Sequence, residues 1–206
     1  MIKQGHEECT GKIFRIAGVC GSGKTTVTAL LSDLSRETFL PYRQIDTAKI
    51  LCELTGVSSE EQYREISLKE RQSCYPSLVC RITAIADASP EYVWFFERHL
   101  CSMSEVDGNI VERGVPDEHG ARMIGIAIIV AHQEQVLAWR DKDIRVRKDR
   151  QVISAAKITE EQTKEVELAF KAKDKWGFPV RLFFNRTEQS NVVAVEILDF
   201  MREVIR

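Results

Sequence analysis

The chain has 206 residues, a length that suits one globular domain with a sizeable hydrophobic core. Hydrophobic residues make up 44% of it, charged residues make up 29% and the formal net charge is −2, which excludes a disordered chain and gives no global electrostatic reason to bind nucleic acid. No apolar stretch approaches the length of a membrane span, and the first residues lack the apolar segment of a signal peptide, so we expect a cytoplasmic protein without a membrane partner.

A phosphate-binding loop is predicted between the first strand and the first helix. The apolar run 13–17 leads into GVCGSGKT, residues 18–25, which matches G-x-x-x-x-G-K-[ST] at every fixed position, and a helical pattern continues to about Thr38. Glycines leave the loop amides bare for phosphate, and the helix N-terminus adds further N–H groups. We expect these residues to hold a donor nucleotide, ATP: Gly18, Gly21, Ser22, Gly23, Lys24, Thr25 and Thr26.

Two side chains of this loop have chemical roles in the prediction. Lys24 should reach the β and γ phosphates, and the Thr25 hydroxyl should ligate Mg²⁺. Cys20 has two interpretations: a small residue tolerated at a free loop position, or a thiol whose oxidation would block nucleotide entry. The six cysteines form no C-x-x-C pair, which argues against a structural zinc site.

A second strand is predicted over 40–45 and a helix over 48–54, with Asp46 between them. Asp46 has two interpretations, because a carboxylate at the end of a strand can accept the proton of a hydroxyl substrate and can equally cap the following helix. Two further helices are expected, over 59–66 and 68–88.

The second half of the chain continues the alternation of strands and helices. A buried third strand over 92–96 delivers Glu97, Arg98 and His99 to its carboxyl end, and the glycines and proline of 101–120 predict a long surface loop. Further strands are expected over 124–130 and 180–184, and helices over 133–140, 159–176 and 189–205.

A charged segment over 140–152 contains Arg140, Arg145 and Arg147. It can fold over the phosphates as a lid, because guanidinium groups suit phosphate oxygens. It can equally be a solvated helix in which neighbouring aspartates pair with the arginines.

These elements predict a three-layer α/β fold of the P-loop NTPase class, in which a central five-stranded parallel sheet is flanked by helices and carries a short lid. We expect one domain over 1–206. Ligands of such sheets bind at the carboxyl ends of the strands. That rule brings together the phosphate loop, Asp46, 97–99, 131–150 and Asn185.

The order of motifs resembles the archaeal-type adenylate kinases, small members of the nucleoside monophosphate kinase family. The resemblance rests on GVCGSGKTTVTALLSDL, EEQYREISLKERQ, a strand that ends in ERH, WRDKDIRVRKD and VRLFFN. It implies ATP as donor, AMP as first acceptor and Mg²⁺ as the metal. It also implies an acceptor-binding helical region over 46–90, in which Arg64 binds the monophosphate.

The resemblance assigns other residues as well. His99 falls where the family places a histidine beside the acceptor, and Asn185 matches the residue whose loop borders the adenine of ATP. The lid arginines of the family match Arg140, Arg145 and Arg147. Glu97 stands where the family has an aspartate and could bind Mg²⁺ through water, or activate water in a hydrolase.

Three functions remain open. The first is a nucleoside monophosphate kinase, whose acceptor is already an oxyanion and needs no general base. The second is a kinase that phosphorylates a hydroxyl of another small molecule, for which Asp46 would be the base. The third is a nucleotide-dependent regulatory or assembly ATPase. The expected catalytic residues are Lys24, Asp46, Arg140, Arg145 and Arg147.

Overall fold

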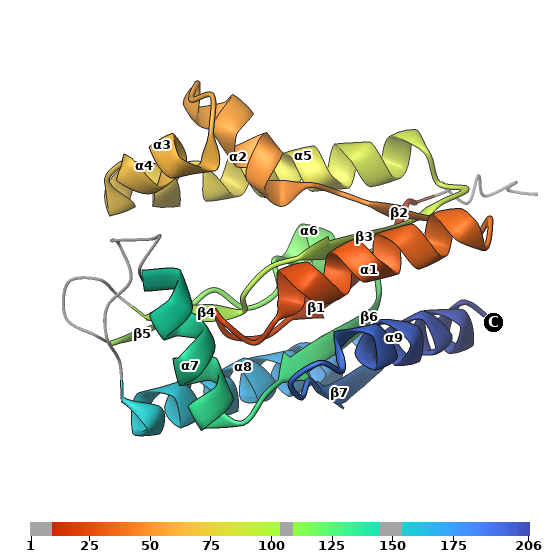
Figure 1. Ribbon diagram of the computed structural model, residues 1–206. Helices are drawn as coiled ribbons and strands as arrows, with labels where there is room; N and C mark the ends of the chain where they lie inside the picture. Colours follow the sequence, from red (N-terminus) through yellow and green to blue (C-terminus); the bar gives the residue numbers. More distant parts are fainter. Residues whose placement is uncertain (1–9, 104–108, 145–153) are drawn as a thin grey trace, which may run out of the picture.

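A five-stranded parallel sheet lies between two layers of helices in the computed structural model, which describes residues 10–103, 109–144 and 154–206 (Figure 1). The strand order is β2–β3–β1–β6–β7, so β3 lies between the first two strands of the chain. This architecture confirms the predicted three-layer α/β fold. The bounds of the sheet strands are β1 (Lys12–Ala17), β2 (Tyr42–Gln44), β3 (Val93–Glu97), β6 (Met123–Val130) and β7 (Val180–Phe184).

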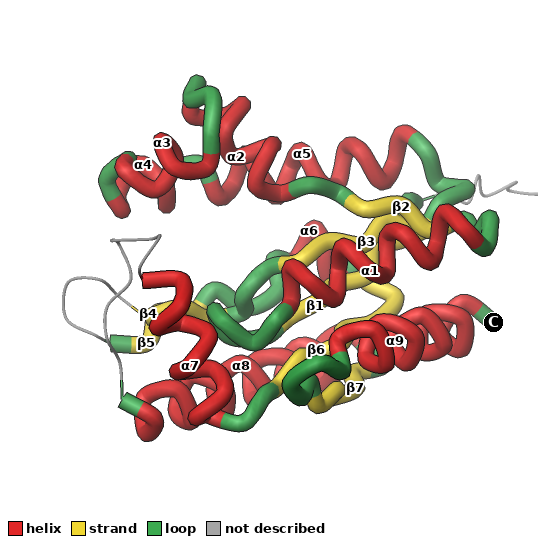
Figure 2. Tube along the Cα trace, viewed as in Figure 1, coloured by secondary structure: helices red, strands yellow, loops and turns green. Residues whose placement is uncertain are grey.

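The two faces of the sheet are covered by different helices (Figure 2). One face packs against α1 (Lys24–Glu37) and α9 (Ser190–Ile205), and the other packs mainly against α2 (Thr47–Thr55), α5 (Tyr75–Ala88) and α8 (Ala155–Trp176). Side chains alternate along β1, since Phe14 and Ile16 face the first pair of helices and Ile13 and Ala17 face the second group. Because both faces are buried, such strands appear in the sequence as nearly continuous apolar runs.

The stretch 101–120, predicted as a loop, contains a hairpin and a short helix. β4 (Cys101–Met103) pairs antiparallel with β5 (Ile110–Glu112), and α6 (Asp117–Gly120) follows. The amide of Cys101 donates to the Glu165 carboxylate on α8 at 2.8 Å, so a contact with a distant helix fixes where the hairpin begins. The loop prediction was wrong because these strands are too short to show a period and depend on tertiary contacts.

Helix limits also differ from the prediction. The single helix expected over 68–88 is two helices, α4 (Leu68–Ser73) and α5, with Pro76 in the first turn of α5. Proline cannot continue a helix but suits its first turn. The short α3 (Glu60–Glu65) precedes them.

Helix α8 begins at Ala155 rather than Thr159, because the Ser154 side chain accepts from the Lys157 amide and caps it. Helix α7 (Gln133–Ile144) extends past Arg140, so the first part of the predicted lid is helical. The remainder of that segment lies outside the described residues. Within those residues, none of the helices has both the length and the apolar character needed to cross a bilayer.

Stability should depend on pH through His119, which is 2% exposed in α6 and packs edge-on against Phe96. Its Nε2 lies 3.2 Å from the Val79 carbonyl oxygen. Burial lowers the pKa of His119 to about 4 in the folded protein, whereas its pKa in the unfolded chain is 6.5. Between pH 6.5 and pH 4 the imidazole is therefore protonated in the unfolded chain and neutral in the folded protein. The free energy of unfolding should therefore fall as the pH drops from 6.5 to 4, by on the order of 3 kcal/mol at the lower end.

Urea denaturation of wild type and His119→Gln at pH 7.5 and pH 4.5 measures this effect. The glutamine can still donate to Val79 but does not titrate, so the variant should lose less stability on acidification than the wild type. Exposed His132 offers the control, His132→Gln, whose pH dependence should match the wild type. An equal loss in His119→Gln and wild type would contradict the prediction.

Candidate functional site

The phosphate loop connects β1 to α1 in a backbone conformation that favours glycine at positions 18, 21 and 23, as the first and last of these show. Gly18 and Gly23 have φ values of 138° and 86°, which other residues rarely adopt. A Cβ on Gly18 would lie 2.3 Å from the Ile129 carbonyl oxygen, and a Cβ on Gly23 would lie 2.2 Å from Nδ2 of Asn185. The glycines predicted from the motif are therefore required by their neighbours as well as by their dihedral angles.

Asn185 supports the same loop from the end of β7. Its side chain is 1% exposed, Nδ2 donates to the Ser22 carbonyl oxygen at 2.9 Å and Oδ1 accepts from Ser190 at 3.2 Å. The amide group of Asn185 is thus hydrogen-bonded to the loop backbone through Nδ2 and to Ser190 through Oδ1. A role for its loop beside an adenine remains a prediction.

Helix α8 presents a buried carboxylate, Glu165, to the start of the loop. Glu165 accepts hydrogen bonds from the amides of Gly18 (2.9 Å), Leu100 (2.8 Å) and Cys101 (2.8 Å), and also from the Cys101 thiol. One side chain thereby joins the phosphate loop to the segment that follows β3.

One helical turn earlier, Glu161 forms a buried ion pair with Arg140 at 2.9 Å. Arg140 also donates from Nε to the Cys20 carbonyl oxygen at 2.7 Å and is only 7% exposed. The prediction that Arg140 belongs to a lid that folds over the phosphates needs correction, because this side chain lies within α7, pairs with Glu161 and donates to the loop backbone. Arg145 and Arg147 lie outside the described residues.

Lys24 and Thr25 are the first two residues of α1, and their roles toward phosphate and Mg²⁺ stay predictions. Lys24 is 6% exposed and its Nζ donates to the Val19 carbonyl oxygen at 2.7 Å; burial lowers its pKa. The Thr25 hydroxyl lies 3.1 and 3.2 Å from the two carboxylate oxygens of Glu97, whose pKa burial raises. The loop and the end of β3 therefore meet at a hydroxyl–carboxylate pair.

The donor set fits a nucleotide with Mg²⁺. The Ser22 hydroxyl is buried with no hydrogen-bond partner in the described ranges. It belongs to the glycine-rich loop, in which the amides of Gly18 and Ser22 donate to Glu165 and to the Val19 carbonyl oxygen. No group of three or more metal-binding His, Cys, Asp or Glu side chains occurs in the part of the chain that the structure describes. Thr25 and Glu97 offer a hydroxyl and a carboxylate, and Mg²⁺ commonly takes one or two such protein ligands together with phosphate oxygens and water.

His99 lies beside the loop in its neutral form. Its Nδ1 is 2.6 Å from the Gly18 carbonyl oxygen, so this nitrogen carries the proton and Nε2 keeps a free lone pair. Burial and the neighbouring Lys24 hold the pKa of His99 well below its usual value. The imidazole is therefore an acceptor at neutral pH.

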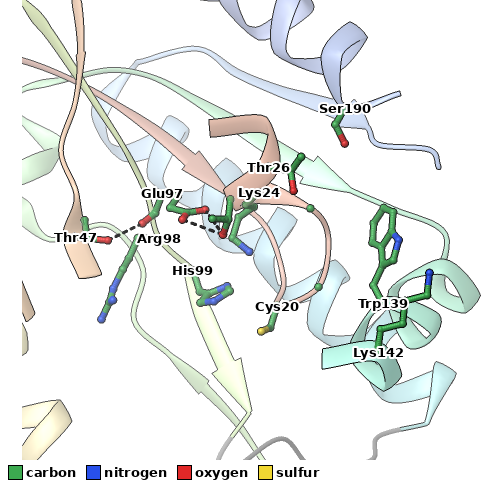
Figure 3. A pocket seen from close by; sticks show the side chains of 13 residues that line it. Cys20, Lys24, Thr26, Thr47, Glu97, Arg98, His99, Trp139, Lys142 and Ser190 are labelled. Atoms are coloured by element: carbon green, nitrogen blue, oxygen red, sulfur yellow. Dashed lines mark hydrogen bonds between the residues drawn. The ribbon is translucent and has the colours of Figure 1, made fainter. Parts of the chain in front are cut away.

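A cavity of about 610 Å³ connects these groups (Figure 3). Of the predicted site residues, Gly21, Gly23, Lys24, Thr25, Thr26, Glu97 and His99 line it. Gly18 and Ser22 belong to the loop but do not line the cavity, and Arg140 and Asn185 donate to carbonyl oxygens of the loop. Asp46 is exposed and does not line the cavity; its carboxylate accepts from the Lys49 amide at 2.9 Å, as a cap of α2. Arg64 belongs to α3, and its side chain is outside the described part.

Sequence reasoning placed three further residues of the cavity wall at the site only as members of the ranges 97–99 and 131–150, without a role of their own: Arg98, Trp139 and Lys142. It missed Thr47 and Ser190. The packing of α7 beside Gly23 is what brings Trp139 to the loop.

No protein-family model matches the chain, and no curated protein is similar to it in sequence. Solved structures are similar in fold. A shikimate kinase from Acinetobacter baumannii in complex with shikimate is 14% identical with a TM-score of 0.52, over 94% of each chain. A shikimate kinase from Bacteroides thetaiotaomicron is 10% identical with a TM-score of 0.50, over 93% of this chain and 98% of its own.

A protein from Chloroflexus aurantiacus J-10-fl, provisionally described as a kinase, is 13% identical with a TM-score of 0.54, over 96% of this chain and 100% of its own. At such identities the likeness establishes the fold alone, and that fold is the one found in P-loop kinases. The archaeal adenylate kinase type implied by the sequence stays a prediction.

Proposed function

We propose that the protein transfers the γ-phosphoryl group of ATP to a small-molecule acceptor. One observation carries this proposal: Lys24, Thr25 and Glu97 face the same cavity as Arg98 and His99. The first three suit the donor phosphates and their metal, and the last two suit an acceptor. A nucleotide-dependent switch needs residues for the donor phosphates and their metal, but it does not need residues for an acceptor.

In the transfer, an acceptor oxygen bonds to the γ-phosphorus while the bond from that phosphorus to the β–γ bridging oxygen breaks, and ADP leaves. Lys24 and the loop amides would stabilise charge on the phosphate oxygens. Thr25 and Glu97 would hold Mg²⁺, which neutralises phosphate charge when bound.

Two acceptor classes fit this site. A nucleoside monophosphate, with AMP first, is the acceptor that the family resemblance implies, and its phosphate needs no base. A hydroxyl acceptor must lose a proton, and the free Nε2 of neutral His99 could receive it. The fold shared with shikimate kinases supports this second class.

An acceptor screen tests the proposal. ADP formation from ATP would be measured with AMP, CMP, UMP, GMP and dTMP, and with a panel of hydroxy acids that includes shikimate. We expect turnover that depends on a member of one panel. Hydrolysis that no acceptor stimulates would contradict the kinase proposal and favour a regulatory ATPase.

Replacement of Asp46 by asparagine should leave turnover within about threefold of wild type, because the carboxylate already caps α2 and asparagine caps equally well. Steady-state ADP formation with the best acceptor measures this. Asp46→Ala serves as the comparison, since it removes the cap and should cost about 1 kcal/mol of stability. A loss of about 100-fold or more in Asp46→Asn would instead identify a general base.

A further inference from the structure

Two arginines from different segments lie near one tyrosine ring. Arg98 follows β3 and Arg113 follows β5, and their guanidinium carbons lie 5.9 and 6.0 Å from the centroid of Tyr75. Arg98 also lines the cavity that contains Lys24 and Glu97. In Figure 3 its side chain extends from the end of β3 away from the phosphate loop.

A third arginine fixes the backbone that carries this pair. Arg15, 1% exposed in β1, donates to the carbonyl oxygens of Arg98 (3.2 Å), His99 (2.5 Å) and Gly114 (3.0 Å). The amides of Arg113 and Gly114 both donate to the Leu100 carbonyl oxygen, at 2.8 and 2.9 Å. The two arginines are therefore held in place by buried hydrogen bonds rather than by their own side chains.

The charge of the two arginines is not compensated by a carboxylate within the described residues. Neither Arg98 nor Arg113 forms an ion pair with a carboxylate of the described residues, and Arg113 donates from its side chain only to the Ser102 hydroxyl, at 3.1 Å. The Nε of Arg98 is buried without a hydrogen-bond partner in the same ranges. Burial and the nearby Arg113 lower the pKa of Arg98. Two like charges near each other in half-buried positions cost free energy, which a bound anion would offset.

We propose that Arg98 and Arg113 form an oxyanion-binding subsite, and that the acceptor carries a carboxylate or a phosphate monoester there. The assignment of this anion to the phosphoryl acceptor rests on the proposed function, whereas the anion subsite itself does not. The acceptor would present its reactive oxygen near Lys24 and its anionic group at Arg98. This arrangement would make the anionic group a requirement of acceptor recognition.

Inorganic phosphate is the probe for this subsite. The protein would first be saturated with Mg²⁺ and a non-hydrolysable ATP analogue, so that the phosphate loop is filled and calorimetry reports a second anion site. We expect the wild type to bind phosphate, and Arg98→Gln and Arg113→Gln each to bind it at least about tenfold more weakly.

Arg43 provides the matched control, because it is also half-buried and stacks on a tyrosine, Tyr92, at 4.5 Å. Arg43→Gln should bind phosphate like the wild type. Arg98→Gln should unfold at the same or a higher urea concentration, since it removes repulsion. Wild-type phosphate affinity in both Arg98→Gln and Arg113→Gln, or no phosphate binding by the wild type, would overturn the proposal.

Steady-state kinetics distinguish whether the anion bound at this subsite is the phosphate of a monoester acceptor or the carboxylate of a hydroxy acid. The KM for either phosphate monoesters or hydroxy acids should rise at least about tenfold in both variants, with the KM for ATP unchanged. If phosphate binding depends on Arg98 but no acceptor supports turnover, the subsite stands and the kinase proposal fails. An active acceptor whose KM is the same in wild type and both variants would overturn the subsite.

Discussion

Replacement of Lys24 by methionine should lower acceptor-dependent ADP formation by about 10²–10³-fold at saturating substrates. Lys24 is the cation of the phosphate loop, it lines the cavity and it lies beside Glu97. Methionine keeps an unbranched apolar stem of similar length but removes the charge that would stabilise the transferring phosphoryl group. The measurement is the turnover number in a coupled ADP assay.

Two controls distinguish a loss of catalysis in Lys24→Met from a loss of folding. Because a buried cation is costly, Lys24→Met should unfold at the same or a higher urea concentration than the wild type. Lys49→Met, at an exposed position on α2, should retain full turnover. Turnover of Lys24→Met within about threefold of wild type would show that the loop does not act on a phosphoryl group.

Replacement of Glu165 by methionine should lower the free energy of unfolding by about 3 kcal/mol or more. The carboxylate is 1% exposed and accepts from three backbone amides, which methionine would leave buried and unsatisfied. Activity should fall as well, because Gly18 and the segment after β3 lose their common anchor. Urea denaturation measures the stability change.

The same helix offers a matched control for this substitution. Glu167 is 60% exposed and pairs only at the surface with Lys164, so Glu167→Met should cost at most about 1 kcal/mol. If the two variants unfold at the same urea concentration, Glu165 does not hold the loop as its hydrogen bonds indicate.

The phosphate loop and the fold class could be predicted because their determinants are local. The loop donors are consecutive backbone amides, so the spacing of residues 18–25 is sufficient to identify them. The sheet is recognisable because strands buried on both faces are apolar throughout, as in β6 with its burial at nearly every position. The hairpin of β4 and β5 could not be predicted, since strands that short follow their tertiary neighbours.

For Asp46 the structure shows one of the two predicted roles, that of a helix cap, and the role of general base stays a prediction. At the end of β2 a carboxylate can be a base or a cap, and the hydrogen bond from the Lys49 amide shows that it caps α2. For Arg140 the position predicted from the sequence was wrong. It belongs to a charged segment in the sequence, yet Glu161, from a different helix, draws it into a buried ion pair against the loop.

The sequence by itself determined the parallel α/β sheet and the glycine-rich loop between its first strand and first helix, because runs of apolar residues and the loop motif can be read from neighbours along the chain. The donor nucleotide stays a prediction. The tertiary structure alone decided that Arg98 and Arg113 both lie near Tyr75, and that Glu165 joins Gly18 to Leu100. These contacts join segments far apart in the chain. No local period or motif encodes such a contact, since it forms only when packing of the helices onto the sheet brings the segments together.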